Sequence, residues 1–100
     1  MGRDIFEEES VQMLISALTR IKSREESRAL LEDLLTSKEI LDIAQRLEVA
    51  KMLSEKTVYS RIAEKTGAST ATISRVNRSV QYGTGGYQAA LERIEQQKKP

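Results

Sequence analysis

The chain has 100 residues, of which 31% are charged, and a formal net charge of +1 at pH 7. It contains no His and no Cys, so an imidazole base, a thiol nucleophile and a zinc site of the usual Cys/His kind are excluded, and we expect no metal. No apolar run approaches the roughly 20 residues that cross a bilayer. We therefore expect a soluble, cytoplasmic protein without membrane contact.

The composition favours helices over strands. The only Pro is the last residue, and Leu, Ile, Ala, Glu, Lys and Arg make up long stretches of the chain. We predict an all-α protein with about six helices in a single domain, residues 1–100. A chain of this length is close to the lower limit at which one core stabilises a fold, which raises the expectation of a partner chain.

The charges are unevenly distributed along the sequence. Residues 1–35 carry five Lys/Arg and eight Asp/Glu, whereas residues 56–82 carry five Lys/Arg and one Asp/Glu. This local basic excess suits a polyanionic partner better than the net charge does.

Helical spacing and capping residues predict the first two helices. Apolar residues recur at helical spacing over residues 11–21, with Ser10 as a possible N-cap. A second helix follows Ser23, which has Glu26 at the S-x-x-E spacing of a capping box. In that box each side chain bonds to the other residue's free backbone N–H.

The third predicted helix is the longest and covers residues 38–55. It begins at a second capping box, formed by Thr36 and Glu39. Its apolar residues are spread over more than one side, so a single neighbouring helix is not enough to cover them.

Two short helices joined by a tight turn follow. The first covers residues 58–66 and ends at Gly67, because glycine tolerates the positive φ of a helix C-terminus. Ser69 caps the second, residues 70–80. Three glycines in "YGTGGY" then interrupt the chain before a last helix over residues 87–97.

A pair of short helices with a Gly-containing turn is typical of a helix-turn-helix, whose second helix enters the major groove of DNA. Ala63 precedes Gly67 by four residues, which lets the two helices cross closely, although a plain helical hairpin has the same spacing. Together with the basic excess, the pattern favours DNA binding over a hairpin that only packs. The residues placed to pack the two helices together are Ile62, Ala68, Ile73 and Val76.

The second short helix has an aliphatic side and, at about 100° per residue, an opposite side of small and basic residues. Small residues let a helix approach base edges and phosphates closely, while hydroxyls and Arg side chains bond to bases and helix N-terminal N–H groups attract anions. The alternative is an ordinary solvated helix surface. The predicted DNA-binding residues are Ser69, Thr70, Ala71, Ser74, Arg75 and Arg78, with Arg61, Lys65 and Lys56 as phosphate contacts.

The stretches "LLTSKEILDIAQRLEVAKML" and "GASTATISRVNRSV" resemble the Trp repressor family, and more closely its branch of small bacterial Trp-repressor-related proteins. The resemblance covers roughly residues 34–80. It implies an intertwined homodimer with a dimerisation core (residues 1–55), a helix-turn-helix (56–82) and a C-terminal helix (83–100). It also implies a transcriptional regulator that binds double-stranded DNA.

The same resemblance places the tryptophan-binding positions of the repressor on four residues that match in type: Thr36, Arg46, Arg75 and Ser79. The repressor has glycine where this chain has Val76, whose branched side chain would occupy volume that the indole ring needs. We therefore expect that tryptophan does not bind and that no cofactor is needed. Whether another small molecule controls the protein is left open.

Two other classes of function compete with this interpretation. An adaptor could keep the helical scaffold and bind a partner protein through its acidic first helices, without binding DNA. Catalysis is not expected, because the carboxylates of Glu7 to Glu9, Glu25 and Glu26 lie where helix starts favour acidic residues.

Overall fold

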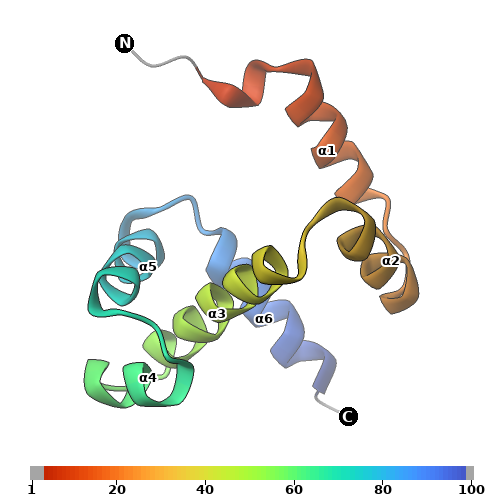
Figure 1. Cartoon of the computed structure of the whole chain (residues 1–100). Coiled ribbons are helices and arrows are strands. Elements are labelled where there is room, and N and C mark those ends of the chain that lie inside the picture. The colour runs from red at the N-terminus through yellow and green to blue at the C-terminus, as the bar shows by residue number, and fades with distance from the viewer. Residues whose placement is uncertain (1–3, 99–100) are drawn as a thin grey trace. The chain divides into compact units, whose positions relative to one another are not determined.

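The computed structural model describes residues 4–98, which form six α-helices and one short 3-10 helix, with no strand among them (Figure 1). The predicted all-α fold is confirmed. The elements are η1 (Ile5–Glu7), α1 (Glu9–Thr19), α2 (Arg24–Leu34), α3 (Ser37–Ser54), α4 (Tyr59–Thr66), α5 (Thr70–Tyr82) and α6 (Gly86–Lys98).

The described residues divide into two compact units, with the boundary between residues 37 and 38. The first unit holds η1, α1 and α2, and the second holds almost all of α3 together with α4, α5 and α6. The division proposed from sequence, at residues 55 and 82, stays a prediction. No helix within residues 4–98 combines the length and the hydrophobicity that a membrane span requires.

In the first unit, one predicted cap is confirmed and another is wrong. Ser23 caps α2, since its side chain accepts a hydrogen bond of 3.1 Å from the backbone N–H of Glu26. The Glu26 carboxylate accepts a hydrogen bond of 2.9 Å from the backbone N–H of Lys22 rather than from that of Ser23, which the capping box predicts. Ser10 lies inside α1, whose N-cap is Glu8. The preceding 3-10 turn brings the chain into the helix earlier than the apolar spacing indicates.

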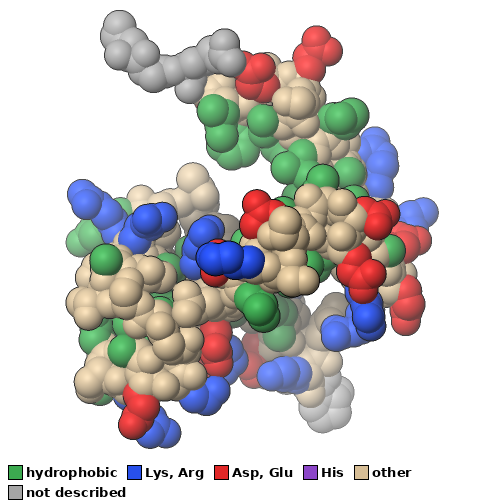
Figure 2. Space-filling view, viewed as in Figure 1, with side chains coloured by type: hydrophobic (Ala, Val, Ile, Leu, Met, Phe, Trp, Pro, Cys, Tyr) green, Lys and Arg blue, Asp and Glu red, His purple; other side chains and the backbone are tan. Residues whose placement is uncertain are grey.

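None of the described residues of the first unit is buried. The apolar side of α1, which includes Leu14 and Leu18, is largely exposed, and Figure 2 shows hydrophobic side chains along this unit. Two short helices whose apolar residues are at most partly buried gain little from packing, which normally supplies most of the stability of a helix in a protein. The exposed large apolar residues of this unit are Ile5, Phe6, Met13, Leu14, Ile15, Leu18, Leu31 and Leu34.

The second unit contains the buried core. Each of α3, α4 and α5 contributes side chains, and those of Val49, Ile62 and Ile73 have no exposed surface. Tyr87 and Leu91 of α6 pack against the same cluster. The four residues predicted to pack the two short helices are all buried, which confirms that prediction. The core residues are Val49, Ala50, Ile62, Ala68, Ile73 and Val76.

The turn that follows α3 contains the one non-glycine residue with positive φ among residues 4–98, Lys56 (φ 64°). The backbone N–H of Lys56 donates to Leu53 O and that of Thr57 donates to Met52 O, both at 3.0 Å. These two bonds form a Schellman motif, in which the residue at positive φ is usually glycine. The turn into α4 is therefore closed at the steric cost of a side chain in the left-handed region.

Glycines determine how α5 ends and α6 begins. The helix runs two residues past the predicted end, to Tyr82. At Gly83 the backbone N–H donates to Ser79 O at 2.9 Å, and a Cβ at this position would overlap the same carbonyl. Gly85 has a φ of 88°, which favours glycine. The chain then enters α6 at Gly86, one residue earlier than predicted.

The free energy of unfolding of the Lys56→Gly variant is expected to exceed that of Lys56→Ala by about 1 kcal/mol, because glycine adopts this φ without a Cβ clash. Both substitutions remove the charge, so their difference isolates the backbone conformation. Urea titrations at equal protein concentration measure it. Gly67→Ala, at φ 76°, is the control that should lose stability. A Lys56→Ala protein as stable as Lys56→Gly would contradict this explanation.

Candidate nucleic-acid interface

The turn between α4 and α5 is held by its own backbone and by one threonine. Gly67 adopts the left-handed conformation predicted for it, and its N–H donates to Ala63 O at 2.8 Å. The Thr66 hydroxyl donates to Ile62 O at 2.8 Å and accepts from the Ala68 N–H at 3.1 Å. The turn therefore satisfies these particular polar groups locally and positions α5 directly after α4.

Ser69 begins α5 as predicted. Its hydroxyl oxygen accepts a hydrogen bond of 3.1 Å from the Thr72 N–H, and Ser69 and Thr72 also bond through their hydroxyls. This side-chain cap fixes the first turn of the helix, where the remaining free N–H groups form the positive end of the helix dipole.

The two sides of α5 differ sharply in burial. Ile73 and Val76 lie in the core with 0% and 2% of their surface exposed. The small and basic residues on the other side are all exposed. The side of α5 that would meet a ligand is thus not covered by the rest of the second unit. The six residues in question are Ser69, Thr70, Ala71, Ser74, Arg75 and Arg78.

Arg75 and Arg78 carry the positive charge of this surface. Within residues 4–98 neither guanidinium has an ion pair or a side-chain hydrogen bond, and Figure 2 shows Lys and Arg side chains gathered over α5. A guanidinium without a protein partner keeps its five donors available for an anion or a base edge. The surface therefore suits a polyanion.

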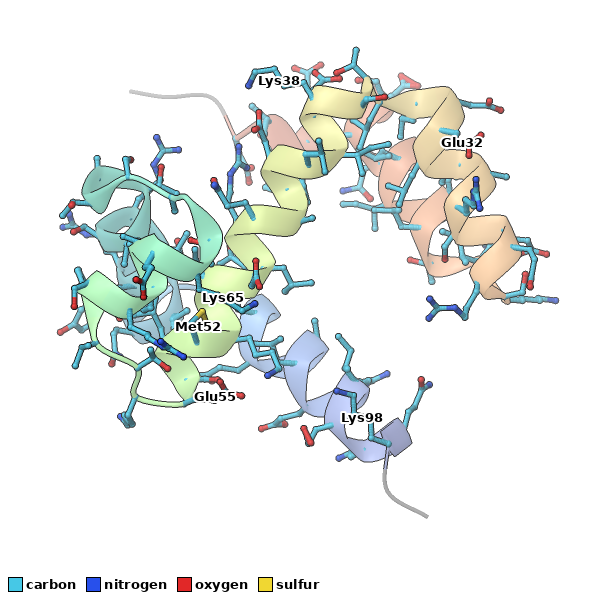
Figure 3. All side chains as sticks on the ribbon, turned by 60° about the horizontal axis from the view of Figure 1, so that its bottom comes forward. Glu32, Lys38, Met52, Glu55, Lys65 and Lys98 are labelled. Carbon is cyan, nitrogen blue, oxygen red and sulfur yellow. The ribbon has the colours of Figure 1, made fainter. Side chains whose placement is uncertain are left out.

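The three predicted phosphate contacts are also exposed, but two of them have acidic neighbours. Arg61 lies 3.7 Å from Glu64. Lys65 extends from α4 to α3, where its ammonium lies 3.1 Å from the Glu48 carboxylate (Figure 3). Lys56 occupies the turn before α4 and has no ion pair within the described chain. Exposed pairs of this kind are weak and can exchange partners with a phosphate.

Two of the four predicted ligand-binding residues lie together. Arg46 and Arg75 line a cavity of about 230 Å³ between α3 and α5, with Val76 on its wall. Ser79 lines a different hollow, next to α6, and Thr36 belongs to the first unit. The remaining residues that line the α3–α5 cavity are Asp42, Gln45 and Thr72.

Sequence reasoning missed Asp42 and Gln45, although their spacing from Arg46 offered a clue. Asp42 precedes Arg46 by one helical turn and so shares its face of α3. Asp42 also pairs with Lys38 at 2.9 Å. No group of three or more acidic side chains that could hold a metal ion occurs within residues 4–98.

Two short helices, a left-handed glycine turn and an exposed basic face on the second helix define a helix-turn-helix protein. Residues 9–95 match the sequence profile of the family described as Trp repressor protein. The chain belongs to the Trp repressor family. This is a regulatory, non-enzymatic family, and membership suggests a DNA-binding regulator.

Relatives of the chain span nearly its whole length. It is 45% identical over 86 residues to YerC of Bacillus subtilis, an uncharacterized protein, and this match covers 86% of this chain and 83% of YerC. A TrpR-like protein from Eubacterium eligens is 48% identical, with a TM-score of 0.86 and coverage of 93% and 96% of the two chains. A candidate Trp repressor from Staphylococcus aureus is 38% identical, with a TM-score of 0.83 and coverage of 94% and 96%.

Ser69→Ala is expected to lower the free energy of unfolding by about 1 kcal/mol, because the Thr72 N–H loses its side-chain acceptor. Urea titration measures this change. Ser74→Ala is the matched control, since Ser74 is exposed within the helix and alanine has the higher helix propensity. Equal destabilisation in the two variants would show that the cap does not stabilise α5.

Proposed function

We propose that the protein is a cytoplasmic transcriptional regulator that binds specific sites on double-stranded DNA as a homodimer. The observation that carries this proposal is the division of α5. Its aliphatic side is buried in the core, and its opposite side exposes small residues together with two arginines that have no partner in the described chain. Membership of the Trp repressor family supports the same function.

The residues on the exposed side of α5 have two different roles in this proposal. Thr70, Ala71 and Ser74 are small enough to let the helix approach base edges, and their methyl and hydroxyl groups suit thymine methyls and polar base atoms. Arg75 and Arg78 are long enough to reach a guanine or a phosphate with two parallel donors. Base contacts of this kind specify the sequence.

Phosphate contacts come from residues around α4. Lys56, Arg61 and Lys65 are exposed, and a phosphate would replace the Glu64 and Glu48 carboxylates beside the last two. Such contacts fix the register of the protein on DNA without reading its sequence.

Unpartnered apolar surface supports the homodimer. The first unit buries none of its described residues and exposes the apolar side of α1. The second unit has an open groove of about 550 Å³ between α3 and α6, whose lining includes Leu47, Leu91 and Ile94. Monomeric proteins rarely leave large contiguous apolar surfaces exposed, so both surfaces suit burial against a second copy. A two-fold dimer would place its α5 helices in successive major grooves, about 34 Å apart.

Tryptophan is not part of the proposed mechanism. Val76 lies on the wall of the α3–α5 cavity and belongs to the buried core, where its side chain fills volume beside Arg46 and Arg75. DNA affinity is therefore expected to be the same with and without added tryptophan.

Arg78→Ala is expected to weaken binding to duplex DNA and to reduce the salt slope of log K by about 0.9 for each interaction with a phosphate that the substitution removes. If Arg78 also contacts a base, sites selected from random DNA by the variant should lose preference at one position in each half-site. Fluorescence anisotropy titrations from low to moderate salt, with and without tryptophan, measure the affinity.

Arg93→Ala, which removes an exposed arginine from α6, is the matched control and should leave both affinity and slope unchanged. Unaltered affinity and base preference in Arg78→Ala would show that this side of α5 does not face DNA. An adaptor would enrich no DNA motif at all.

Leu18→Glu is expected to convert the dimer into monomers, because it places a charge on the apolar side of α1. Sedimentation velocity measures the change. Ser16→Glu adds the same charge about 160° around the helix and should leave the dimer intact. A wild-type protein that sediments as a monomer, or a dimer unaffected by Leu18→Glu, would contradict the proposed interface.

A further inference from the structure

A glutamine of α3 is bonded to the turn of the helix-turn-helix. The Nε2 of Gln45 donates to the carbonyl oxygen of Thr66, the last residue of α4, at 3.1 Å, across 21 residues of sequence. The bond is partly buried. It satisfies one of the carbonyls that a helix C-terminus leaves without an intrahelical partner.

The residue that accepts this bond, Thr66, also holds the turn through its side chain. The Thr66 hydroxyl already donates to Ile62 O and accepts from the Ala68 N–H, and the next residue is the left-handed Gly67. With the Thr66 carbonyl bonded to Gln45, the polar groups of the turn are connected to α3 as well as to each other. A movement of the turn relative to α3 would break a directional interaction.

The apolar contacts beside this bond do not supply the same constraint. Val49 lies one helical turn after Gln45 and is fully buried with Ile62 and Ile73. Burial of aliphatic side chains is non-directional, so it holds α5 near α3 without fixing its orientation. A hydrogen bond weakens when its distance or angle changes. Gln45 also lines the cavity that Arg75 lines, so it lies next to the DNA-facing side of α5.

We propose that Gln45 is a positioning residue that sets the orientation of α4, the turn and α5 relative to α3, and so the fit of α5 to its DNA site. This inference rests on the proposed function. The neighbouring Lys65–Glu48 pair does not have this role, because both side chains are substantially exposed and such pairs contribute little.

The first test needs no DNA. Gln45→Met keeps a side chain of similar length and shape but removes the donor. Amide hydrogen exchange at Gly67 and Ala68, followed by NMR, should become about fivefold faster than in the wild type, as expected from the removal of one net hydrogen bond. Gln96→Met, on the exposed surface of α6, is the matched control and should leave these rates unchanged. Unchanged rates in Gln45→Met would overturn the inference.

The second test compares two kinds of DNA. Gln45→Met should bind the site selected by the wild type about fivefold more weakly. Its affinity for random-sequence duplex, and the salt slope, should change by less than twofold, because the phosphate-contacting residues are intact. A variant that merely unfolds would lose both affinities in proportion. Equal weakening on both DNAs, or none on either, would overturn the positioning role.

Gln45→Glu is a companion variant of almost the same size. At pH 7 its carboxylate cannot donate a hydrogen bond to the Thr66 carbonyl. Gly67 and Ala68 should therefore exchange at least as fast in Gln45→Glu as in Gln45→Met. Wild-type exchange rates in Gln45→Glu would contradict the role of the donor.

Failure of the inference and failure of the proposed function give different results. A wild-type protein that enriches no DNA motif would overturn the proposed function and the DNA consequence of Gln45. The exchange rates of Gly67 and Ala68 would still decide whether the Gln45 bond holds the turn.

Discussion

The burial of one side of α5 against α3 and α4 is the packing interaction on which the rest of the structure depends. Ile73 and Val76 are covered by a core that includes Val49 and Ile62. A helix with its aliphatic side covered in this way must present its other side outward. In this chain that other side consists of small residues and arginines, so the packing of the core and the exposure of the candidate DNA surface have one cause. Gln45 adds a directional hydrogen bond to this packing.

The two units of the chain differ in how much of their apolar surface each one buries. The second unit has a closed core, whereas the first unit has a side-chain cap on α2 but no buried residue among those described. Local capping specifies where a helix starts, but it does not provide the burial that makes a short helix stable. This difference explains why a homodimer is part of the proposed function: the apolar side of α1 needs a surface that its own unit does not provide.

Features set by neighbouring residues could be predicted from the sequence. The left-handed turn at Gly67 and the cap at Ser69 depend on intrinsic conformational preferences, and the four aliphatic residues of the two short helices follow from helical spacing. The predicted start of α1 at Ser10 is wrong, because the 3-10 turn before it has no periodicity. The Gln45–Thr66 bond and the Lys65–Glu48 pair join residues 21 and 17 positions apart. Interactions of that range depend on how helices pack, which spacing within one helix does not reveal.

The most direct measurement is an NMR titration of the protein with a short duplex DNA at low salt, followed through the backbone amides. The proposed function predicts that the largest chemical-shift changes fall on residues 69–78, at the exposed side of α5 and its N-terminus, with smaller changes near Lys56 and Arg61. Changes concentrated in α1 and α2, or an unaltered spectrum, would contradict the claim that the exposed side of α5 is the surface that meets DNA.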